Sequence, residues 1–149
     1  MIKKTRIRKQ SISLGFTLIE IIVTITIIGL LTTIGIVSFQ QAVKKGRDGK
    51  RKSDLAQIQS ALEIYRSDVA AYPTGLAAGG AAWTYDGNTY MQKVPLDPKP
   101  TPYQYYYSSD GISYDICAYL ESPSSTDGSC GAGTVSCGDE NCNYGVSNP

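Results

Sequence analysis

The longest hydrophobic segment of the chain runs from residue 15 to residue 39 and contains a single charged side chain, Glu20. A segment of this length matches the ~20 residues that an α-helix needs to cross the ~30 Å hydrocarbon core of a bilayer. Because the backbone in lipid must satisfy its own hydrogen bonds, a single span has to be helical. The pattern therefore predicts a transmembrane helix over residues 16–39.

Glu20 is the unusual member of this segment. A carboxylate inside a bilayer costs about 2.5–3.5 kcal/mol near the centre of a span and less toward the interface. Glu20 therefore either has a functional partner or lies at the level of the lipid headgroups.

Gly29 and Gly35 each weaken the helix by about 1 kcal/mol relative to alanine. These glycines mark either close helix packing or a section of the helix that can bend or unwind.

A second, amphipathic pattern predicts a helix over residues 40–72. Pro73 ends it, because proline cannot donate the helical hydrogen bond and disfavours a helical residue before it. Either a cap at Ser53 or Asp54 starts this helix, or one helix continues from residue 17, with Gly46 and Gly49 as the expected places for a break. Apolar residues on one helix face recur every three or four positions, at Leu55, Ile58, Leu62, Tyr65, Val69 and Tyr72.

Alternating patterns later in the chain predict a β-hairpin. In the first run, Tyr103, Tyr105 and Tyr107 alternate with Gln104, Tyr106 and Ser108. In the second run, apolar residues alternate with mostly polar ones over 112–120, and a turn at Ser109–Gly111 joins the two runs. The apolar side of this hairpin has a partner in the helix face described above. The loop over residues 74–99 is rich in small residues, and its aromatic members are expected to anchor it: Trp83, Tyr85 and Tyr90.

The predicted fold class is therefore α+β. A long N-terminal helix, whose N-terminal half is transmembrane, carries a small antiparallel sheet on its C-terminal half. Residues 73–149 form a globular head with a loop, a hairpin and a cysteine-rich tail.

Charge is unevenly distributed along the chain. The formal net charge is +1, but the first 15 residues hold five basic side chains and no acid, which leaves nine basic and 13 acidic side chains in the rest. This balance gives little reason to expect nucleic-acid binding. Residues 44–52 form a basic run that is either a solvated face or a site for acidic groups of a neighbouring subunit.

The sequence offers no catalytic constellation. Histidine is absent, which excludes Ser/His and Cys/His nucleophile systems and zinc sites that need imidazole. Glycine-rich phosphate loops are also absent. We therefore expect that the protein is not an enzyme.

Four cysteines lie in the last third of the chain, at Cys117, Cys130, Cys137 and Cys142. Their spacing fits zinc sites poorly, so we expect two disulfides in an oxidising compartment. The spacing does not choose among the three pairings.

The cysteine-rich tail also contains side chains whose oxygen atoms could bind calcium. They are Asp127, Asp139, Glu140, Asn141 and Asn143. A solvated acidic loop is the preferred interpretation of these residues.

Residues 1–15 have the form of a leader peptide: a short basic segment ahead of an apolar run. An ordinary secretory signal is cut after its apolar region, but no Ala-x-Ala site follows this one. A cut is therefore expected before the apolar run, at Gly15, because a residue without a side chain lets a protease approach the backbone closely.

Several segments resemble one known family. Residues 15–20, Gly-Phe-Thr-Leu-Ile-Glu, are similar to the processing motif of type IV pilins and type II secretion pseudopilins. Residues 51–55, the Tyr72-Pro73 pair, and the Val94-Pro95-x-Asp97-Pro98 motif ahead of the tyrosines resemble the major pseudopilin group. The resemblance covers about residues 1–120 and leaves the cysteine tail outside, which is unlike the calcium-binding end of a typical major pseudopilin.

This resemblance implies a sequence of events. A prepilin peptidase/methyltransferase would cut between Gly15 and Phe16 and N-methylate Phe16. Glu20 would then face the terminal amine of an adjacent subunit, and an opposite charge makes a carboxylate tolerable in an apolar bundle. The other implied partners are copies of the chain in a helical filament, the membrane and an inner-membrane assembly platform.

Three functions are compatible with the sequence. The first is a structural subunit, pilin or pseudopilin: a single-pass membrane protein that later forms an extracellular or periplasmic filament at the cell surface. The second is a minor or competence-type pilin that binds DNA through Lys44–Lys52 or adheres through its tyrosines. The third is a single-span anchored protein that never polymerises.

Overall fold

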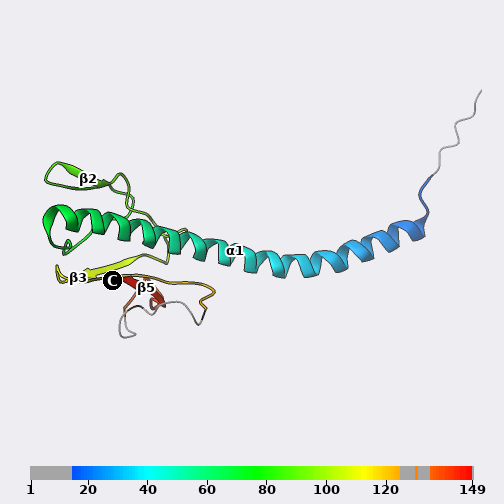
Figure 1. Cartoon of the computed structure of the whole chain (residues 1–149). Coiled ribbons are helices and arrows are strands. Elements are labelled where there is room, and N and C mark those ends of the chain that lie inside the picture. The colour runs from blue at the N-terminus through cyan, green and yellow to red at the C-terminus, as the bar shows by residue number, and fades with distance from the viewer. Residues whose placement is uncertain (1–14, 125–129, 131–134, 149) are drawn as a thin grey trace, which may run out of the picture. The chain divides into compact units, whose positions relative to one another are not determined.

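One long helix organises the structure, a computed structural model that describes residues 15–124, 130 and 135–148. Helix α1, Leu18–Val69, is 52 residues long (Figure 1). The chain divides into two compact units, Met1–Phe39 and Gln40–Pro149, and we call the second the head unit. Residues 1–14, most of the predicted leader, lie outside the described residues.

Helix α1 passes through every position at which the sequence suggested a break or a new start. Gly46 and Gly49 are helical, and Ser53 and Asp54 lie inside the helix, so the predicted cap is wrong. The Asp54 carboxylate is used by other donors instead: it pairs with Lys50 one turn earlier and accepts a hydrogen bond of 2.8 Å from the Tyr105 hydroxyl. A cap is unnecessary where the preceding turn already continues the helical hydrogen bonds.

The helix ends three residues earlier than predicted, at Val69 rather than Tyr72. Ala70 has a φ of 61°, the left-handed conformation that commonly terminates helices. The Tyr72 amide then donates to the Gly111 carbonyl at 2.9 Å. Tyr72 therefore leaves the helix and joins the core beside the hairpin turn.

A three-stranded antiparallel sheet contains the predicted hairpin. Its strands are β3 (Tyr106–Ser109), β4 (Tyr114–Ala118) and β5 (Tyr144–Ser147), in the order β3-β4-β5. The hairpin prediction is confirmed, with Tyr107 paired opposite Ile116, but its bounds differ. Tyr103 and Tyr105 precede β3, and Ile112 lies in the turn before β4, where it is exposed instead of packed on the helix. Strand β5 is new, because the tail shows no alternation that would have indicated a strand.

The core joins this sheet to one face of α1, as the periodicity predicted. Leu55, Ile58 and Leu62 from the helix and Ile116 and Ala118 from β4 are each at most 1% exposed and form one cluster. Burying such side chains contributes about 1.5–3 kcal/mol for each large one. The helix face and the hairpin therefore stabilise each other.

A second, two-stranded sheet lies in the segment predicted as a loop. Strands β1 (Trp83–Tyr85) and β2 (Asn88–Met91) are antiparallel. Asp86 and Gly87 between them both have positive φ, as the tightest hairpin turns require. The strands are too short for an alternating pattern to identify them, but the aromatic anchoring is confirmed: the Tyr65 ring lies 5.1–5.3 Å from the rings of Trp83, Tyr85 and Tyr90.

Two disulfides hold the tail, Cys117–Cys130 and Cys137–Cys142. The first joins β4 to Cys130, which packs against Gly145 of β5. Gly145 of β5 lies opposite Cys117, and a Cβ added there would lie 2.8 Å from the Cys130 Cα. Only glycine fits at this position, so the Cys117–Cys130 disulfide and β5 are packed as one unit.

Replacing both Cys117 and Cys130 with serine should lower the free energy of unfolding by about 3 kcal/mol, because the unfolded chain is no longer closed into a loop. Hydrogen exchange should show faster exchange at β5 amides, while amides of α1 near Leu55 stay protected. The Cys137→Ser/Cys142→Ser variant is the matched control and should leave β5 protected. Unchanged protection of β5 in the Cys117/Cys130 variant would contradict the packing of β5 against the Cys117–Cys130 disulfide.

Candidate functional site

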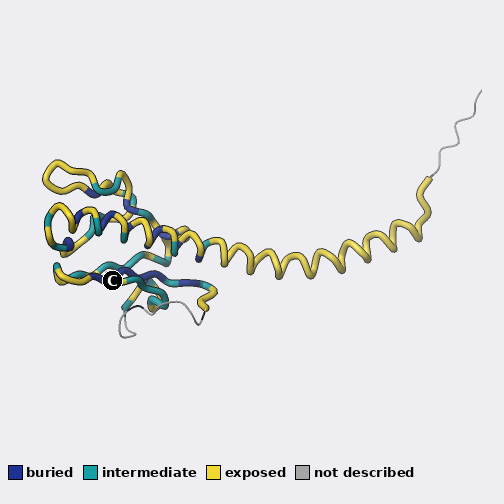
Figure 2. Tube along the Cα trace, in the orientation of Figure 1, coloured by how far each residue is buried: buried dark blue, intermediate teal, exposed yellow. Residues whose placement is uncertain are grey.

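The first part of α1 exposes apolar side chains on all sides. Every residue from 15 to 46 is exposed (Figure 2). By length and composition, α1 includes a segment able to cross a membrane. Contiguous exposed apolar surface of this extent requires a covering partner, and lipid and neighbouring protein chains both meet that requirement. The large exposed side chains of this surface include Ile19, Ile22, Ile25, Ile28, Leu31, Ile34 and Phe39.

Glu20 and Thr17 form a reciprocal cap at the start of α1. The Thr17 amide and hydroxyl both donate to Glu20 Oε2 at 2.9 Å, and the Glu20 amide donates to the Thr17 hydroxyl at 3.3 Å. This is a capping box, which satisfies helix donors that otherwise lack partners. In the single chain, the Glu20 carboxylate therefore already has a partner, and it is a local one.

The predicted processing site directly precedes this cap. Gly15 and Phe16 are exposed and non-helical, and Phe16 is 85% exposed. A Cβ added at Gly15 would meet nothing within 4 Å. The absence of a side chain at Gly15 is thus not required by any contact among the described residues.

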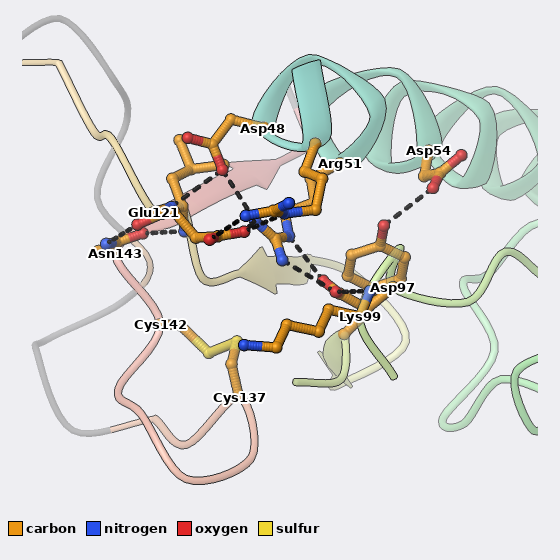
Figure 3. Close-up of polar contacts among 12 residues, drawn as sticks. Asp48, Arg51, Asp54, Asp97, Lys99, Glu121, Cys137, Cys142 and Asn143 are labelled. Atoms are coloured by element: carbon orange, nitrogen blue, oxygen red, sulfur yellow. Dashed lines mark hydrogen bonds and ion pairs between the residues drawn. A yellow bond between two sulfur atoms is a disulfide. The ribbon is translucent and has the colours of Figure 1, made fainter. Parts of the chain in front are cut away.

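A buried ionic cluster lies in the head unit, and it is the arrangement that sequence reasoning missed (Figure 3). We define the Arg51 cluster as Arg47, Asp48, Arg51, Asp97 and Glu121. The Arg51 side chain is fully buried, and its guanidinium meets three carboxylates. It binds Asp97 in a bidentate pair at 2.7 and 2.9 Å, Asp48 at 2.8 Å and Glu121 at 3.0 Å.

The remaining members complete the hydrogen bonding of the Arg51 cluster. Arg47 binds Glu121 in a second bidentate pair, with both distances 2.6 Å. Asp48 also accepts the backbone amides of Glu121 and Ser122 at 2.9 and 2.8 Å. Hydrogen bonds from Arg47 are the main cause that lowers the pKa of the Glu121 carboxyl to about 2, so this group stays ionised at physiological pH.

The Arg51 cluster connects three segments that lie far apart in the sequence. Asp97 belongs to the proline-rich segment, Glu121 follows β4, and the other members lie on α1. A buried charge is tolerated only when it is paired and hydrogen-bonded. The cluster therefore holds the proline-rich segment and the β4 exit on the helix.

This arrangement corrects one interpretation of the basic run at residues 44–52. Arg51 is buried inside its own chain rather than solvated, and Arg47 is paired internally. Lys50 pairs with Asp54, and Lys52 lies over the Tyr144 ring, 5.2 Å from its centroid. One signal could have indicated the cluster: Asp97 stands between apolar residues and prolines, an unusual place for a carboxylate that is only solvated.

The oxygen ligands considered for calcium are dispersed. Asp127 lies outside the described residues, whereas Asp139, Glu140 and Asn141 are exposed in the loop closed by Cys137 and Cys142. The Asn143 side chain binds the backbone of Leu120 with both its oxygen and its nitrogen. In the part of the chain that the structure describes, no group of three or more histidine, cysteine or acidic side chains is placed to hold a metal ion.

Comparison with known proteins gives consistent results. The family model described as "Type II secretion system (T2SS), protein G" matches residues 38–131, which include the Arg51 cluster but not residues 15–20. A Pseudomonas aeruginosa type II secretion system core protein G is 36% identical over 121 residues, covering 73% of this chain and 82% of the relative. The protein of the same name from Vibrio cholerae is 30% identical over 120 residues, covering 74% and 80%.

A third relative extends the comparison. The Escherichia coli core protein G is 31% identical over 112 residues, covering 68% of this chain and 77% of the relative. No solved structure matches the chain significantly.

Proposed function

Because the chain belongs to the type II secretion system protein G family, we propose that it is a pseudopilin, a structural subunit that polymerises through the first part of α1 into a pseudopilus. The observation that carries this proposal is the exposed apolar surface over residues 16–39. This surface suits two environments in succession, the bilayer before assembly and the core of a filament afterwards. No catalytic role is part of the proposal.

The growth of such a filament needs a contact between two different surfaces of the subunit. A heterologous contact that does not close into a ring continues as an open helical array. A helix that is apolar on every side supports this geometry, because several neighbours can pack on it at once. The head unit, with its own core and disulfides, would remain on the outside.

Processing is the first step of the proposed pathway. A prepilin peptidase/methyltransferase removes residues 1–15 and methylates the new amino terminus at Phe16. The exposed, non-helical geometry of Gly15 and Phe16 supports this step, because a protease needs an accessible, extended backbone. Glu20 then pairs with the terminal amine of an adjacent subunit at the inner-membrane assembly platform.

Helix flexibility in the filament stays a prediction. Gly29 and Gly35 lie within α1, and a Cβ at either position would meet nothing within 4 Å. Their small size is therefore not explained by packing within the single chain, which leaves close helix packing and local unwinding as their proposed roles in the assembled state.

The compartment follows from the same pathway. Before processing, the chain is anchored in the inner membrane with its leader, residues 1–15, in the cytoplasm, and the head unit lies in the periplasm. Two disulfides in the head unit support this placement, since disulfides persist in oxidising compartments.

DNA binding through residues 44–52 is disfavoured by the same structure. A basic patch binds nucleic acid when its side chains can reach phosphates. Arg51 is fully buried among carboxylates and Arg47 is paired with Glu121, so the two arginines of this run are already neutralised. We therefore do not propose a nucleic-acid partner.

Coexpression of the full chain with a prepilin peptidase and an assembly platform should give filaments in sheared material examined by electron microscopy. The Gly15→Leu variant should keep its leader, because the bulky side chain blocks approach to the backbone, and it should give no filaments. Mass spectrometry of the N-terminus checks the cleavage.

Gly49→Leu is the matched control for this experiment: it makes the same change at an exposed glycine outside the processing site and should be cleaved normally. Absence of wild-type filaments in cells where a protein G relative assembles would refute the proposed function. Normal cleavage of Gly15→Leu would refute only the cleavage site.

A further inference from the structure

We propose that the β3–β4 turn of one copy inserts Ile112 into a recess on the head unit of a neighbouring copy and so links subunits of the filament. Apolar side chains lie beside polar groups such as Asp97 and Gln104 in the lining of this recess. The inference rests on the proposed function, since it concerns a contact between assembled copies. We define the recess by its principal apolar lining, which is Leu76, Ala77, Val94, Leu96, Tyr105 and Tyr107.

Ile112 is an exposed apolar side chain at a position that is normally polar. It is 78% exposed, more than any other large hydrophobic side chain among the described residues of the head unit. Turn positions favour Gly, Asn, Asp and Ser, and the neighbours Asp110, Gly111 and Ser113 follow that rule. With this exposure, packing among the described residues does not require an isoleucine at this position.

The turn holds Ile112 in a fixed position. Asp110 Oδ1 accepts the amides of Ile112 and Ser113 at 2.9 and 2.7 Å. The Gly111 carbonyl accepts the Tyr72 amide, which ties the turn to the segment after α1. A protruding side chain on a rigid turn loses little conformational freedom on binding, so this turn is suited to act as a contact point.

The recess provides a site of suitable chemistry and size. It is a cavity of about 480 Å³, with Ile58 and Ile116 of the core in its wall. Leu96, also in the lining, is 49% exposed, so apolar surface is accessible there. A branched aliphatic side chain would remove part of this surface from water, which favours association.

Charges around the two surfaces are complementary. Lys99 lies 5.3 Å from the ring centroid of Tyr103, which lines the recess. Lys93 and Leu96 are neighbours beside Gly80, where an added Cβ would lie within 4.0 Å of both side chains. The turn carries Asp110, and its hydrogen bonds from the Ser113 and Ile112 amides lower its carboxyl pKa. The acidic group of the lining, Asp97, is buried and paired with Arg51, whereas Lys93 and Lys99 are exposed. An acidic turn thus meets a recess whose exposed flanking charges are lysines.

The proposed contact has the symmetry that a filament needs. The turn and the recess are different surfaces of the same chain, so each copy offers one of each to a different neighbour. Such a heterologous contact repeats without closing when the rotation between copies does not complete a ring. It would supplement the packing of the apolar helices.

Cross-linking between two differently substituted chains tests the contact directly. Ala78 is an exposed residue that also lines the recess. Full-length Ile112→Cys and Ala78→Cys chains, coexpressed with the assembly components, should give a covalent dimer in filaments treated with a short bismaleimide. This reagent leaves the two native disulfides intact. The control pair is Asn88→Cys with Ala78→Cys, which places the thiol at the other exposed hairpin turn; a yield no higher than this control overturns the inference.

A second variant tests the energetic role of Ile112. Ile112→Asp should lower filament yield by about tenfold or more, because a charged side chain cannot enter the recess. The variant should fold normally, since Ile112 is exposed, and Ile112→Leu should assemble. Wild-type yield with Ile112→Asp overturns the inference while leaving the proposed function intact, whereas absence of wild-type filaments overturns both.

Discussion

Replacing Arg51 with methionine is expected to lower the free energy of unfolding of the head unit by about 3–5 kcal/mol, the usual cost of removing one partner from a buried ion pair. Methionine keeps an unbranched apolar stem but removes the guanidinium, which leaves Asp97 and Asp48 buried without their cation. Urea unfolding followed by tyrosine fluorescence measures the loss. This variant should have the largest effect on stability of any single change in the basic run.

A matched control separates the Arg51 cluster from general loss of charge. Lys45→Met removes the same charge from an exposed position of α1 and should change stability by less than about 0.5 kcal/mol. The double variant Arg51→Met/Asp97→Leu should recover part of the loss, because removing both charges avoids an unpaired carboxylate. A loss below about 1 kcal/mol for Arg51→Met would contradict a structural role for the cluster.

Replacing Glu20 with valine is expected to abolish filament formation while cleavage and membrane insertion continue. In the proposed filament the carboxylate pairs with the amino terminus of Phe16 of an adjacent subunit. Loss of that partner leaves an amine unpaired in an apolar core, which weakens each contact between subunits by about 3 kcal/mol or more. Such a cost lowers the equilibrium constant of each subunit addition by more than about a hundredfold. Electron microscopy of sheared material and N-terminal mass spectrometry provide the two measurements.

The capping box offers a control for this variant. Thr17→Val removes the hydroxyl that binds Glu20 in the single chain but keeps the carboxylate. Loss of the cap should lower the stability of the first helical turn by about 1 kcal/mol, and Glu20→Val loses the same cap. Thr17→Val should nevertheless assemble, because it keeps the carboxylate. Wild-type filament yield from Glu20→Val would refute the pairing role, and equal loss of filaments in both variants would assign Glu20 to capping alone.

Local patterns in the sequence were sufficient for much of the fold. The apolar run, the helix face through Leu55 and Leu62 and the β3–β4 hairpin each repeat with the period of one element. Such periods arise because one side of a helix or strand faces the core. The resemblance over residues 15–20 and 94–98 likewise depended on contiguous residues. The family match over residues 38–131 includes the second of these segments and not the first.

What the sequence determined, then, is every feature encoded by neighbours along the chain: the apolar run, the helix face, the hairpin and the presence of disulfides. Only the tertiary structure decided which cysteines pair, that β5 completes the sheet, and that Arg51 meets Asp97 and Glu121. The reason is physical. Arg51 and Asp97 are 46 residues apart and Arg47 and Glu121 are 74 apart, and contacts over such separations follow no repeating pattern. Folding brings these groups together, and burial then makes their pairing obligatory.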